Sequence, residues 1–378
     1  MLIVVPREIV AGELRVSLVP ETIKRLVSRK FEVVVAAGAG AGARYSDEDY
    51  RTAGARIEAD PAATFARPGL VVKIQAPTPQ EIAQLLPGTT LICLVYPLSQ
   101  PALVKALTQR GVTVLAADMI PRTTLAQMMD VLSSQATLVG YRAVLLAAAA
   151  LPQLFPMLMT AAGTMAPAKV LVLGAGVAGL QAIATARRLG AVVEAYDVRK
   201  VVKEQVESLG ARFVDVDVAD AAGAGGYAKE LDADSQQRIA AVIATRVARS
   251  NVVITTALVP GRRAPLLLPA SMVHGMKPGS VVVDIAAEQG GNCELTQPGE
   301  TIDVRGVTII GERNMPSKVA VHASAMYSRN MEKLILHITN AEAGLVLDAT
   351  DEIVRGMTIL RDGVVVHPDV IAHIATGA

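Results

Sequence analysis

The sequence contains no tryptophan, two cysteines and few aromatic residues, which form 3% of its 378 residues. Cys93 and Cys293 are too few for a disulfide framework or a four-cysteine zinc site, so no metal centre is predicted and a reducing compartment is favoured. Basic residues number 36 against 35 acidic ones, and the net charge of +1 gives no indication of nucleic acid binding. Neither a signal peptide nor an Arg-rich transit peptide is recognisable before the first apolar stretch, Met1 to Val5.

Apolar residues are abundant instead, at 52% of the chain. With so few aromatics, the core must consist of alanine, valine, leucine and isoleucine, as in parallel sheets covered by helices. The length suggests two domains or slightly more. One uncharged stretch, from Ala143 to Ala168, is long enough to cross a membrane. Pro152, Gln153 and Pro156 interrupt it, so a buried helix followed by a loop is favoured, and the chain is expected to be soluble without a membrane span of its own.

Strands and helices alternate through the first part of the sequence, which predicts an α/β domain with a parallel, doubly wound sheet. Pro20 and Thr78-Pro79 are helix start signals. Helices that cross between two domains are expected from Arg122 to about Leu151 and from Pro316 to about Ile338. The strands predicted here are Leu2–Val5, Phe31–Val35, Leu70–Ile74, Thr90–Val95 and Val112–Ala116, with helices at Glu21–Ser28 and Pro79–Leu86.

A glycine fingerprint, Gly174-Ala175-Gly176-Val177-Ala178-Gly179, follows the apolar strand Val170–Leu173. A helical pattern comes next, and a second apolar run ends at Asp197. This order of strand, glycine turn, helix, strand and acid is typical of dinucleotide-binding domains, in which the helix N-terminus holds the pyrophosphate. An ordinary glycine-rich turn is the alternative. The predicted cofactor-binding residues of this region are Gly174, Gly176, Val177, Ala178, Gly179, Asp197, Val198 and Arg199.

Asp197 indicates which nicotinamide cofactor is bound. A carboxylate at this position can accept both ribose hydroxyls and would repel a 2′-phosphate, which favours NAD(H) over NADP(H). Arg199 and Lys200 lie close by and weaken this inference slightly.

The rest of the second domain is predicted to complete a six-stranded parallel sheet. Its further strands are expected at Ala211–Val216, Asn251–Thr255, Ser280–Asp284 and Val307–Ile310. A long connection, Val218 to Asp234, precedes the next helix and contains two adjacent glycines and one aromatic residue, Tyr227. Connections of this kind are usually two to six residues long. The segment is either a surface loop or a lid that closes over the nucleotide with Tyr227 as its anchor.

The segment from Met119 to Gln135 is unusually polar for a crossing helix. On a helix Gln127, Asp130 and Ser134 would share one face, as would Asp130 and Ser133. The cluster is either a capped helix start with solvated side chains or the lining of a cleft between two domains that holds the nicotinamide.

These features together resemble the NAD(H)-binding component, domain I, of proton-translocating nicotinamide nucleotide transhydrogenase. The resemblance covers essentially the whole chain. It rests on the stretches from Pro121 to Arg142, Gly174 to Ala186, Lys203 to Gly210, Gly225 to Glu230, Thr255 to Gly261 and Gly290 to Cys293.

The resemblance implies roles for particular residues. It places Arg122, Gln127, Asp130 and Ser133 around the nicotinamide. It also implies that Asp197 binds the adenosine ribose and that Tyr227 closes the mobile loop. It also implies cofactor contacts for Gly226, Thr256, Ala257 and Leu258.

Alanine dehydrogenase shares the same fold and is the main rival. Its members use a histidine at the end of a strand in the first domain, but the corresponding stretch here, Ile92 to Tyr96, has none, and all five histidines come after residue 270. Glu288 stands where the dehydrogenase has its second acid. Arg15 and Lys73 occupy positions that resemble its carboxylate-binding residues. Amine oxidation needs a group that moves protons, whereas hydride transfer between two nicotinamides needs none.

The expected protein is therefore the NAD(H)-binding subunit of a proton-translocating, Si-/Re-specific transhydrogenase. Two Rossmann-like domains are predicted, one from residues 1–135 with 320–378 and one from 136–319, with the cofactor in the cleft between them. The partners implied are an NADP(H)-binding component and a membrane-spanning, proton-conducting domain. A homodimer is expected, cytoplasmic and peripheral on the inner membrane of a prokaryote. A catalytically silent NAD-binding module is a further alternative.

Overall fold

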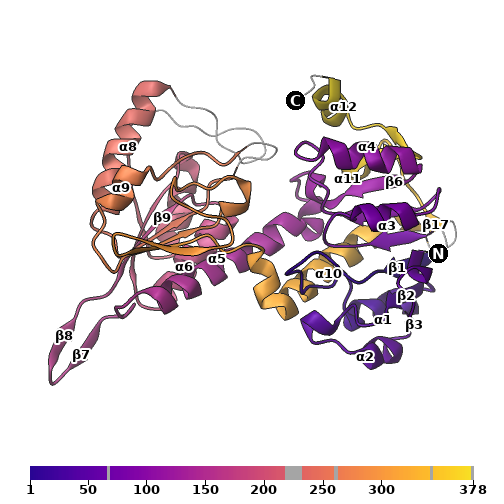
Figure 1. The fold of residues 1–378 in the computed structure, drawn as a ribbon, viewed down its shortest axis with the longest axis horizontal. Coiled ribbons are helices and arrows are strands. Elements are labelled where there is room, and N and C mark those ends of the chain that lie inside the picture. Colours follow the sequence, from indigo (N-terminus) through magenta and orange to yellow (C-terminus); the bar gives the residue numbers. More distant parts are fainter. Residues whose placement is uncertain (66–68, 218–231, 259–262, 341–343, 376–378) are drawn as a thin grey trace. The chain divides into compact units, whose positions relative to one another are not determined.

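The computed structural model describes residues 1–65, 69–217, 232–258, 263–340 and 344–375. It divides the chain into two compact units (Figure 1). Unit 1 comprises Met1–Gln135 with Ser317–Ala378, and unit 2 comprises Ala136–Pro316. Each unit is built around its own sheet.

Unit 1 contains an eight-stranded sheet with the strand order β19-β18-β6-β5-β4-β1-β2-β3. The six strands from β1 to β6 run parallel, and β18 and β19 join antiparallel at one edge. Because the chain proceeds from β1 towards β3 on one side and from β4 towards β6 on the other, the strand order reverses between β1 and β4. The strands are β1 (Leu2–Val5), β2 (Glu32–Ala36), β3 (Arg56–Glu58), β4 (Leu70–Val72), β5 (Thr90–Cys93), β6 (Thr113–Ala116), β18 (Thr358–Arg361) and β19 (Val364–Val365).

Helices cover both faces of this sheet, as the alternating sequence pattern predicts. The start signal at Thr78 is confirmed, because its hydroxyl accepts from Glu81 N–H while the Glu81 carboxylate accepts from Thr78 N–H. The helices are α1 (Pro20–Ser28), α2 (Asp47–Thr52), α3 (Pro79–Gln84), α4 (Pro101–Arg110), α10 (Ala320–His337), α11 (Glu352–Met357) and α12 (Pro368–Ala375).

Helix α10 is attached to the beginning of the chain by serine hydroxyls. Ser324 and Ser328, one helical turn apart, accept hydrogen bonds from the main-chain N–H groups of Val16 and Val19. The irregular segment before α1 thereby satisfies its buried donors without a sheet partner. The predicted helix from Pro316 is replaced over its first turns by a 3-10 segment, Met315–Val319.

Helix α5 (Val131–Ala150) begins nine residues later than the predicted start at Arg122. A short 3-10 turn, Ala126–Met129, comes before it, and Asp130 has extended backbone angles. Aspartate is favoured as the residue that precedes a helix, because its carboxylate accepts the unpaired N–H groups of the first turn. Gln127 and Asp130 therefore do not share a helical face, and that expectation was wrong.

Unit 2 contains a seven-stranded sheet with the order β11-β10-β9-β12-β13-β15-β14. In chain order its six parallel strands follow the arrangement 3-2-1-4-5-6 of dinucleotide-binding domains, with β14 antiparallel at the edge. The fold class, α/β with Rossmann-like parallel sheets, is confirmed. The elements are β9 (Lys169–Leu173), α6 (Val177–Arg188), β10 (Val192–Tyr196), α7 (Lys203–Ser208), β11 (Arg212–Phe213), α8 (Ala233–Val247), β12 (Val252–Thr255), α9 (Ala270–His274), β13 (Val281–Asp284), β14 (Thr301–Val304) and β15 (Val307–Ile310).

Within the described residues, α5 is long and apolar enough to cross a membrane by length and composition, and 33% of its apolar 18-residue stretch is buried. Ala143, Val144 and Ala147 are fully buried in the core of unit 2. These contacts are those of a helix packed on a Rossmann sheet.

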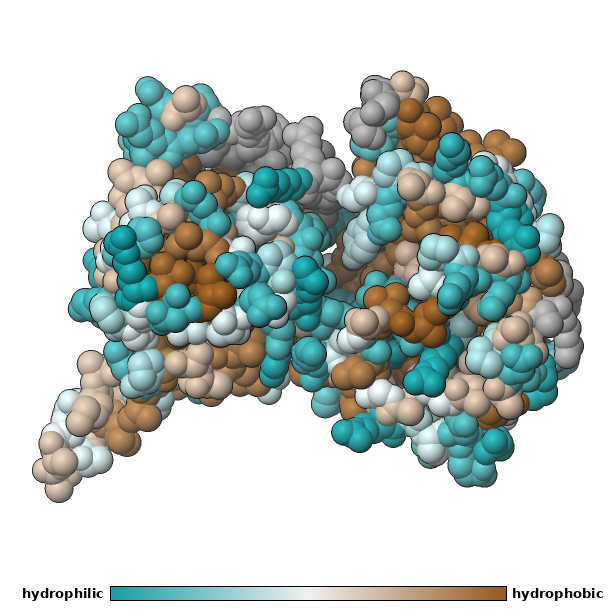
Figure 2. Space-filling model, in the orientation of Figure 1, coloured by the Kyte–Doolittle hydropathy of each residue, from teal (hydrophilic) through white to brown (hydrophobic). Residues whose placement is uncertain are grey.

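The end of the uncharged stretch, where a loop was expected, forms an antiparallel hairpin of β7 (Leu158–Thr160) and β8 (Gly163–Met165). All six strand residues are exposed, Met159 by 74%. The hairpin extends away from the rest of unit 2, and Figure 2 shows it as mostly apolar to neutral surface. The two short strands were missed because a short apolar run carries no periodicity that distinguishes a strand from a loop.

Candidate nucleotide-binding site

The glycine fingerprint lies at the carboxyl ends of β9, β10 and β12. The strand order reverses between β9 and β12, which places this edge at the switch point where open α/β sheets bind ligands. Gly174 directly follows β9, Asp197 follows β10 and Thr256 follows β12. Three segments that are distant in the sequence therefore meet at one place.

The first and last glycines of the fingerprint are required by close packing. Gly174 has φ +104°, a left-handed conformation that favours glycine. A Cβ on Gly174 would lie 2.4 Å from Thr256 Oγ1, and one on Gly179 would lie 1.9 Å from Gly174 O. The sequence-based roles of both residues, a tight turn and close packing of helix on strand, agree with this geometry.

Gly176 differs from its neighbours, because a Cβ placed on it would meet no atom of the described residues within 4 Å. The residue precedes α6, and no described side chain caps the N-terminus of this helix. Val177, the first residue of α6, is 41% exposed. The turn thus presents open space beside main-chain N–H groups and the positive end of a helix dipole, an arrangement suited to a pyrophosphate.

A fourth glycine, Gly140 on α5, supports the turn from the other side. A Cβ there would lie 2.0 Å from Ala178 O, so α5 and the beginning of α6 are in main-chain contact. Sequence reasoning missed this residue because an isolated glycine within a helical pattern carries no specific signal.

Asn292 fixes the segment after β12. Its amide oxygen accepts from Ala257 N–H, and its amide nitrogen donates to the carbonyls of Ala257 and Pro265. Thr256 Oγ1 donates to Gly174 O at 3.1 Å, which ties this segment to the glycine turn. Sequence reasoning identified Asn292 only within the resemblance, and its positioning role follows from these contacts.

Buried Asp284, at the end of β13, organises the neighbouring loop. Its carboxylate accepts from the hydroxyls of Thr255 and Thr296 and from the N–H groups of Ala286 and Cys293. A fully buried aspartate after a strand could have been recognised as a positioning residue, but the sequence analysis did not single it out.

Asp197 is 8% exposed and accepts four hydrogen bonds. One comes from Ala175 N–H in the glycine turn at 2.7 Å, and the other three come from Arg199. Burial raises the pKa of Asp197, but the hydrogen bonds from Arg199 and Ala175 outweigh it, so the pKa lies below its ordinary value. The carboxylate is therefore ionised at neutral pH.

The polar cluster before α5 belongs to unit 1, and the structure shows one clear role within it. Asp130 accepts from Ser133 N–H at 2.9 Å and from Ser133 Oγ at 2.6 Å, and it thereby caps α5. Arg122 and Gln127 are exposed. The capped helix start predicted as one alternative is thus seen for Asp130 and Ser133. A role beside the nicotinamide stays a prediction for Arg122, Gln127, Asp130 and Ser133.

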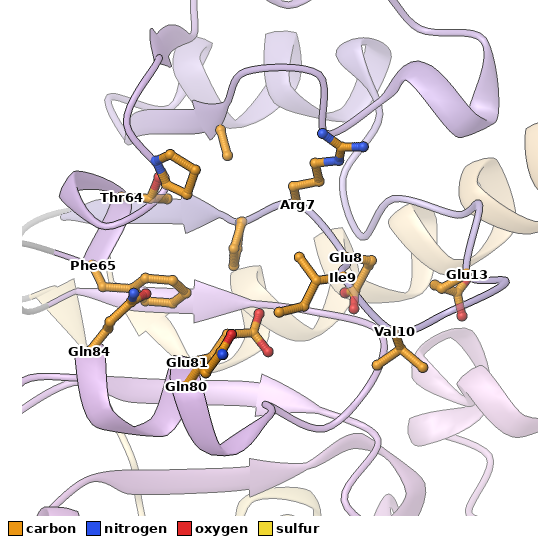
Figure 3. Close-up of a pocket in the computed structure, with 13 residues that line it drawn as sticks. Arg7, Glu8, Ile9, Val10, Glu13, Thr64, Phe65, Gln80, Glu81 and Gln84 are labelled. Carbon is orange, nitrogen blue, oxygen red and sulfur yellow. The ribbon is translucent and has the colours of Figure 1, made fainter.

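Unit 1 has a cavity of about 570 Å³ at the carboxyl ends of β1 and β2, beside its own strand reversal. Figure 3 shows Thr64 and Phe65 on one side and Ile9 on the other. Glu8 and Glu81 line the cavity, and between them lies the buried ammonium group of Lys73, 3.3 Å from Glu8 Oε2 and 2.6 Å from Glu81 Oε1.

Arg15 is likewise buried, at 4% exposure, and engaged by a carboxylate of its own chain. Its guanidinium donates to both oxygens of Glu13, at 2.8 and 2.6 Å, and to Gln135 Oε1. The positive charges of Arg15 and Lys73 are therefore both balanced by carboxylates of unit 1. Sequence analysis singled out Arg15 and Lys73 but not their partners Glu8, Glu13 and Glu81, because the sequence does not show which carboxylates are buried with a cation, even where Glu13 is only two residues from Arg15.

Two predicted residues, Gly226 and Tyr227, lie outside the described residues, as does most of the predicted lid. Leu258 and Val198 lie at the described rim of the nucleotide site, after β12 and β10 respectively. The described residues contain no group of three or more histidines, cysteines or acids that could hold a metal ion.

Comparison with known proteins matches both halves of the chain. Residues 4–139 match the family "Alanine dehydrogenase/PNT, N-terminal domain", and residues 143–368 match "Alanine dehydrogenase/PNT, C-terminal domain". The chain is 45% identical over 377 residues to an NAD(P) transhydrogenase alpha-subunit protein of Rhodospirillum rubrum, covering 97% of this chain and 98% of that protein.

Two solved structures extend this similarity. A transhydrogenase from Sinorhizobium meliloti is 41% identical, with a TM-score of 0.85 over 98% of this chain and 100% of that one. An L-alanine dehydrogenase is 28% identical, with a TM-score of 0.84 and full coverage of both chains.

Proposed function

The chain belongs to the alanine dehydrogenase/PNT family, and from this premise we propose that it is the NAD(H)-binding component of a proton-translocating transhydrogenase. Hydride passes directly from NADH on this chain to NADP⁺ on a partner subunit, with Si-/Re- stereospecificity. A membrane-spanning partner couples the transfer to proton movement. The identity of 45% with a transhydrogenase subunit over nearly the whole length of both chains is the observation that carries the proposal.

The nucleotide site of unit 2 supports NAD(H) as the ligand. The space beside Gly176 and the start of α6 suit a pyrophosphate. The ionised Asp197 lies where the adenosine ribose would be, and it disfavours a 2′-phosphate. Thr256, Ala257 and Leu258 would contact the cofactor from the segment that Asn292 holds. We propose that the two units are the two domains of the protein and that Arg122, Gln127, Asp130 and Ser133 contribute the nicotinamide contacts.

In this mechanism the nicotinamide supplies the hydride chemistry. The residues of the chain bind and orient the cofactor, so that the two C4 atoms approach to about 3–3.5 Å. No protein group needs to transfer a proton, which agrees with the absence of histidine from the first 270 residues of the sequence.

An amino-acid dehydrogenase is the alternative within the family. It would need a cation to hold the carboxylate of its substrate and a group to accept a proton. Arg15 is paired with Glu13, and Lys73 with Glu8 and Glu81, all inside unit 1. An incoming carboxylate would have to displace these buried partners. The transhydrogenase function is therefore favoured over this alternative.

Direct reconstitution tests the proposed function. The chain is mixed with an NADP(H)-binding transhydrogenase component, and hydride transfer from NADH is followed with a spectrally shifted NADP⁺ analogue. We expect transfer that depends on both proteins, and no reduction of NAD⁺ by alanine. Reduction that depends on alanine would favour the dehydrogenase, and NADH binding without transfer to any partner would favour the silent module.

Substitution of the polar cluster should separate catalysis from capping. Arg122→Ala and Gln127→Ala are expected to slow transfer about tenfold or more without changing stability, because a displacement of about 1 Å can cost ~10² in rate. Asp130→Ala should also lower the free energy of unfolding by about 1 kcal/mol through loss of the helix cap. Thr124→Ala, an exposed position in the same segment, serves as the control. Parental transfer rates in all three cluster variants would place the nicotinamide elsewhere.

We further propose that the chain is a homodimer, peripheral on the cytoplasmic face of a prokaryotic inner membrane through its partners. The exposed hairpin β7–β8 supports self-association, because an isolated two-stranded hairpin is at best marginally stable in water. An apolar groove of about 520 Å³ lies beside its base, lined by residues that include Leu154, Phe155 and Leu189. A hairpin and a groove on the same unit are complementary surfaces for two copies of one chain.

Charge on the hairpin should disrupt the dimer. Met159→Glu is expected to convert the protein from dimer to monomer at micromolar concentration, as measured by light scattering. Val364→Glu, which places the same charge on the exposed strand β19 of unit 1, should leave the dimer intact. A monomeric parent protein, or a dimeric Met159→Glu variant, would contradict this assignment.

A further inference from the structure

We propose that Arg199 is a specificity-determining residue, because its guanidinium occupies the positions on Asp197 that the ribose hydroxyls of a bound cofactor would take. NAD(H) then binds only as the Asp197–Arg199 pair opens, and the released guanidinium remains beside the ribose. This inference rests on the proposed NAD(H)-binding function and adds a competing group within the same site.

The hydrogen bonds of Asp197 carry the argument. Its two oxygens offer about four acceptor positions. Oδ1 accepts from Arg199 N–H at 2.9 Å and from Arg199 Nε at 2.8 Å. Oδ2 accepts from Ala175 N–H and from Arg199 Nη2, both at 2.7 Å. All four positions are filled, so a ribose hydroxyl can donate to Asp197 only when one of these donors leaves.

The four donors differ in how readily they can leave. The N–H groups of Ala175 and Arg199 belong to the main chain of the glycine turn and of the turn after β10, and both are positioned by the fold. The guanidinium belongs to a side chain with 17% exposure at the edge of the site, so rotation about its side-chain bonds can remove it. It vacates two positions, one on each oxygen, which equals the number of hydroxyls on an adenosine ribose.

The exchange has a cost for NAD(H). Two charge-assisted hydrogen bonds from Arg199 are replaced by two hydrogen bonds from neutral hydroxyls, which are weaker. The site therefore binds NAD(H) less tightly than it would if Asp197 were not paired with Arg199. A protein that must release NAD⁺ after each turnover benefits from such a limit.

The exchange also affects the choice between cofactors. Asp197 repels a 2′-phosphate, but a released guanidinium beside the ribose supplies an opposite charge at the same place. Arg199 thus opposes the selectivity that Asp197 provides. Its removal should increase affinity for NADH, decrease affinity for NADPH, and widen the difference between them.

Titration of NADH and NADPH against two variants tests the inference. Arg199→Ala should bind NADH about three- to tenfold more tightly than the parent and NADPH about three- to tenfold more weakly. Arg199→Lys, which keeps the charge but loses the two-pronged geometry, should bind NADH more tightly and retain most of the affinity for NADPH. Arg212→Ala removes the same charge from an exposed position on neighbouring β11, which pairs with Glu194 and not with Asp197, and should resemble the parent.

Each outcome has a definite meaning. Tighter NADH and weaker NADPH binding in Arg199→Ala supports the inference. Weaker NADH binding would show that Arg199 contacts the cofactor instead of competing with it, and unchanged affinities would show that the pair does not limit binding; either result overturns it. If neither the parent nor any variant binds NADH, the proposed function itself fails.

Discussion

In the Arg199→Ala background, where no guanidinium competes for the carboxylate, Asp197→Ala is expected to weaken NADH binding by about 1–3 kcal/mol, or about 5- to 150-fold, because on the proposed assignment the carboxylate would accept both hydroxyls of the adenosine ribose. The measurement is a fluorescence titration of NADH with the single and the double variant. The affinity for ADP should fall in parallel, since ADP carries the same ribose.

A modified ligand isolates the ribose contact. The parent protein should bind 2′-deoxy-ADP more weakly than ADP, whereas Asp197→Ala should discriminate little between them. Asp197 also accepts from Ala175 N–H in the glycine turn, so the variant is compared with the parent by circular dichroism and thermal unfolding. A folded variant that still prefers ADP to its 2′-deoxy form by the parental factor would remove Asp197 from the ribose site.

Glu13→Gln is expected to destabilise unit 1 by about 3–5 kcal/mol, the usual cost of leaving a buried charge without its partner. Glu13 accepts from Arg15 through the main-chain N–H and two guanidinium nitrogens, and it also accepts from Gln75 and Ser317. Glutamine keeps the volume but loses the charge, and it presents an NH₂ group to these donors. Urea unfolding measures the change. Glu48→Gln, which affects an exposed ion pair with Arg51, should cost less than about 0.5 kcal/mol.

The pH dependence of the free energy of unfolding gives a second test of the buried pair between Glu13 and Arg15. Burial raises the pKa of Glu13, but the hydrogen bonds and charge of Arg15 outweigh it and lower the pKa from 4.5 to about 2. Its contribution to stability is thus fully present above pH 4.5 and is lost as pH falls towards 2. The parent should lose up to about 3 kcal/mol more than Glu13→Gln over this range. Parallel pH profiles for the two proteins would contradict the buried pair.

Much of the nucleotide site could be predicted because its signals are local. The strand, glycine turn, helix and second strand from Lys169 to Asp197 are consecutive in the sequence, and each glycine role depends on neighbours within this segment or on β12. Strands β9, β10 and β12 are largely apolar, which predicted them as strands of a parallel sheet, whereas the switch point between β9 and β12 was seen only in the structure. The start of α5 was misplaced by nine residues because the residues from Ala126 to Met129, which form a 3-10 turn, fit a helical pattern as well, and Asp130 was not recognised as the residue that caps α5.

Contacts between distant residues could not be predicted in the same way. Gly140 against Ala178, and Asn292 against Ala257, join residues far apart in the sequence. The hairpin from Leu158 to Met165 was taken for a loop after a buried helix, because a short apolar run does not reveal strand pairing or exposure.

The sequence by itself determined the fold class, the fingerprint, the acid proposed for the ribose and the family, because these depend on residue type, period and short-range order. Only the tertiary structure decided that Asp197 has all of its acceptor positions filled, that Arg15 and Lys73 are neutralised by Glu13, Glu8 and Glu81, and that an apolar hairpin is exposed. The physical reason is that hydrogen-bond saturation, charge compensation and burial are properties of the space around an atom, and only the folded chain decides which residues, near or distant in the sequence, fill that space.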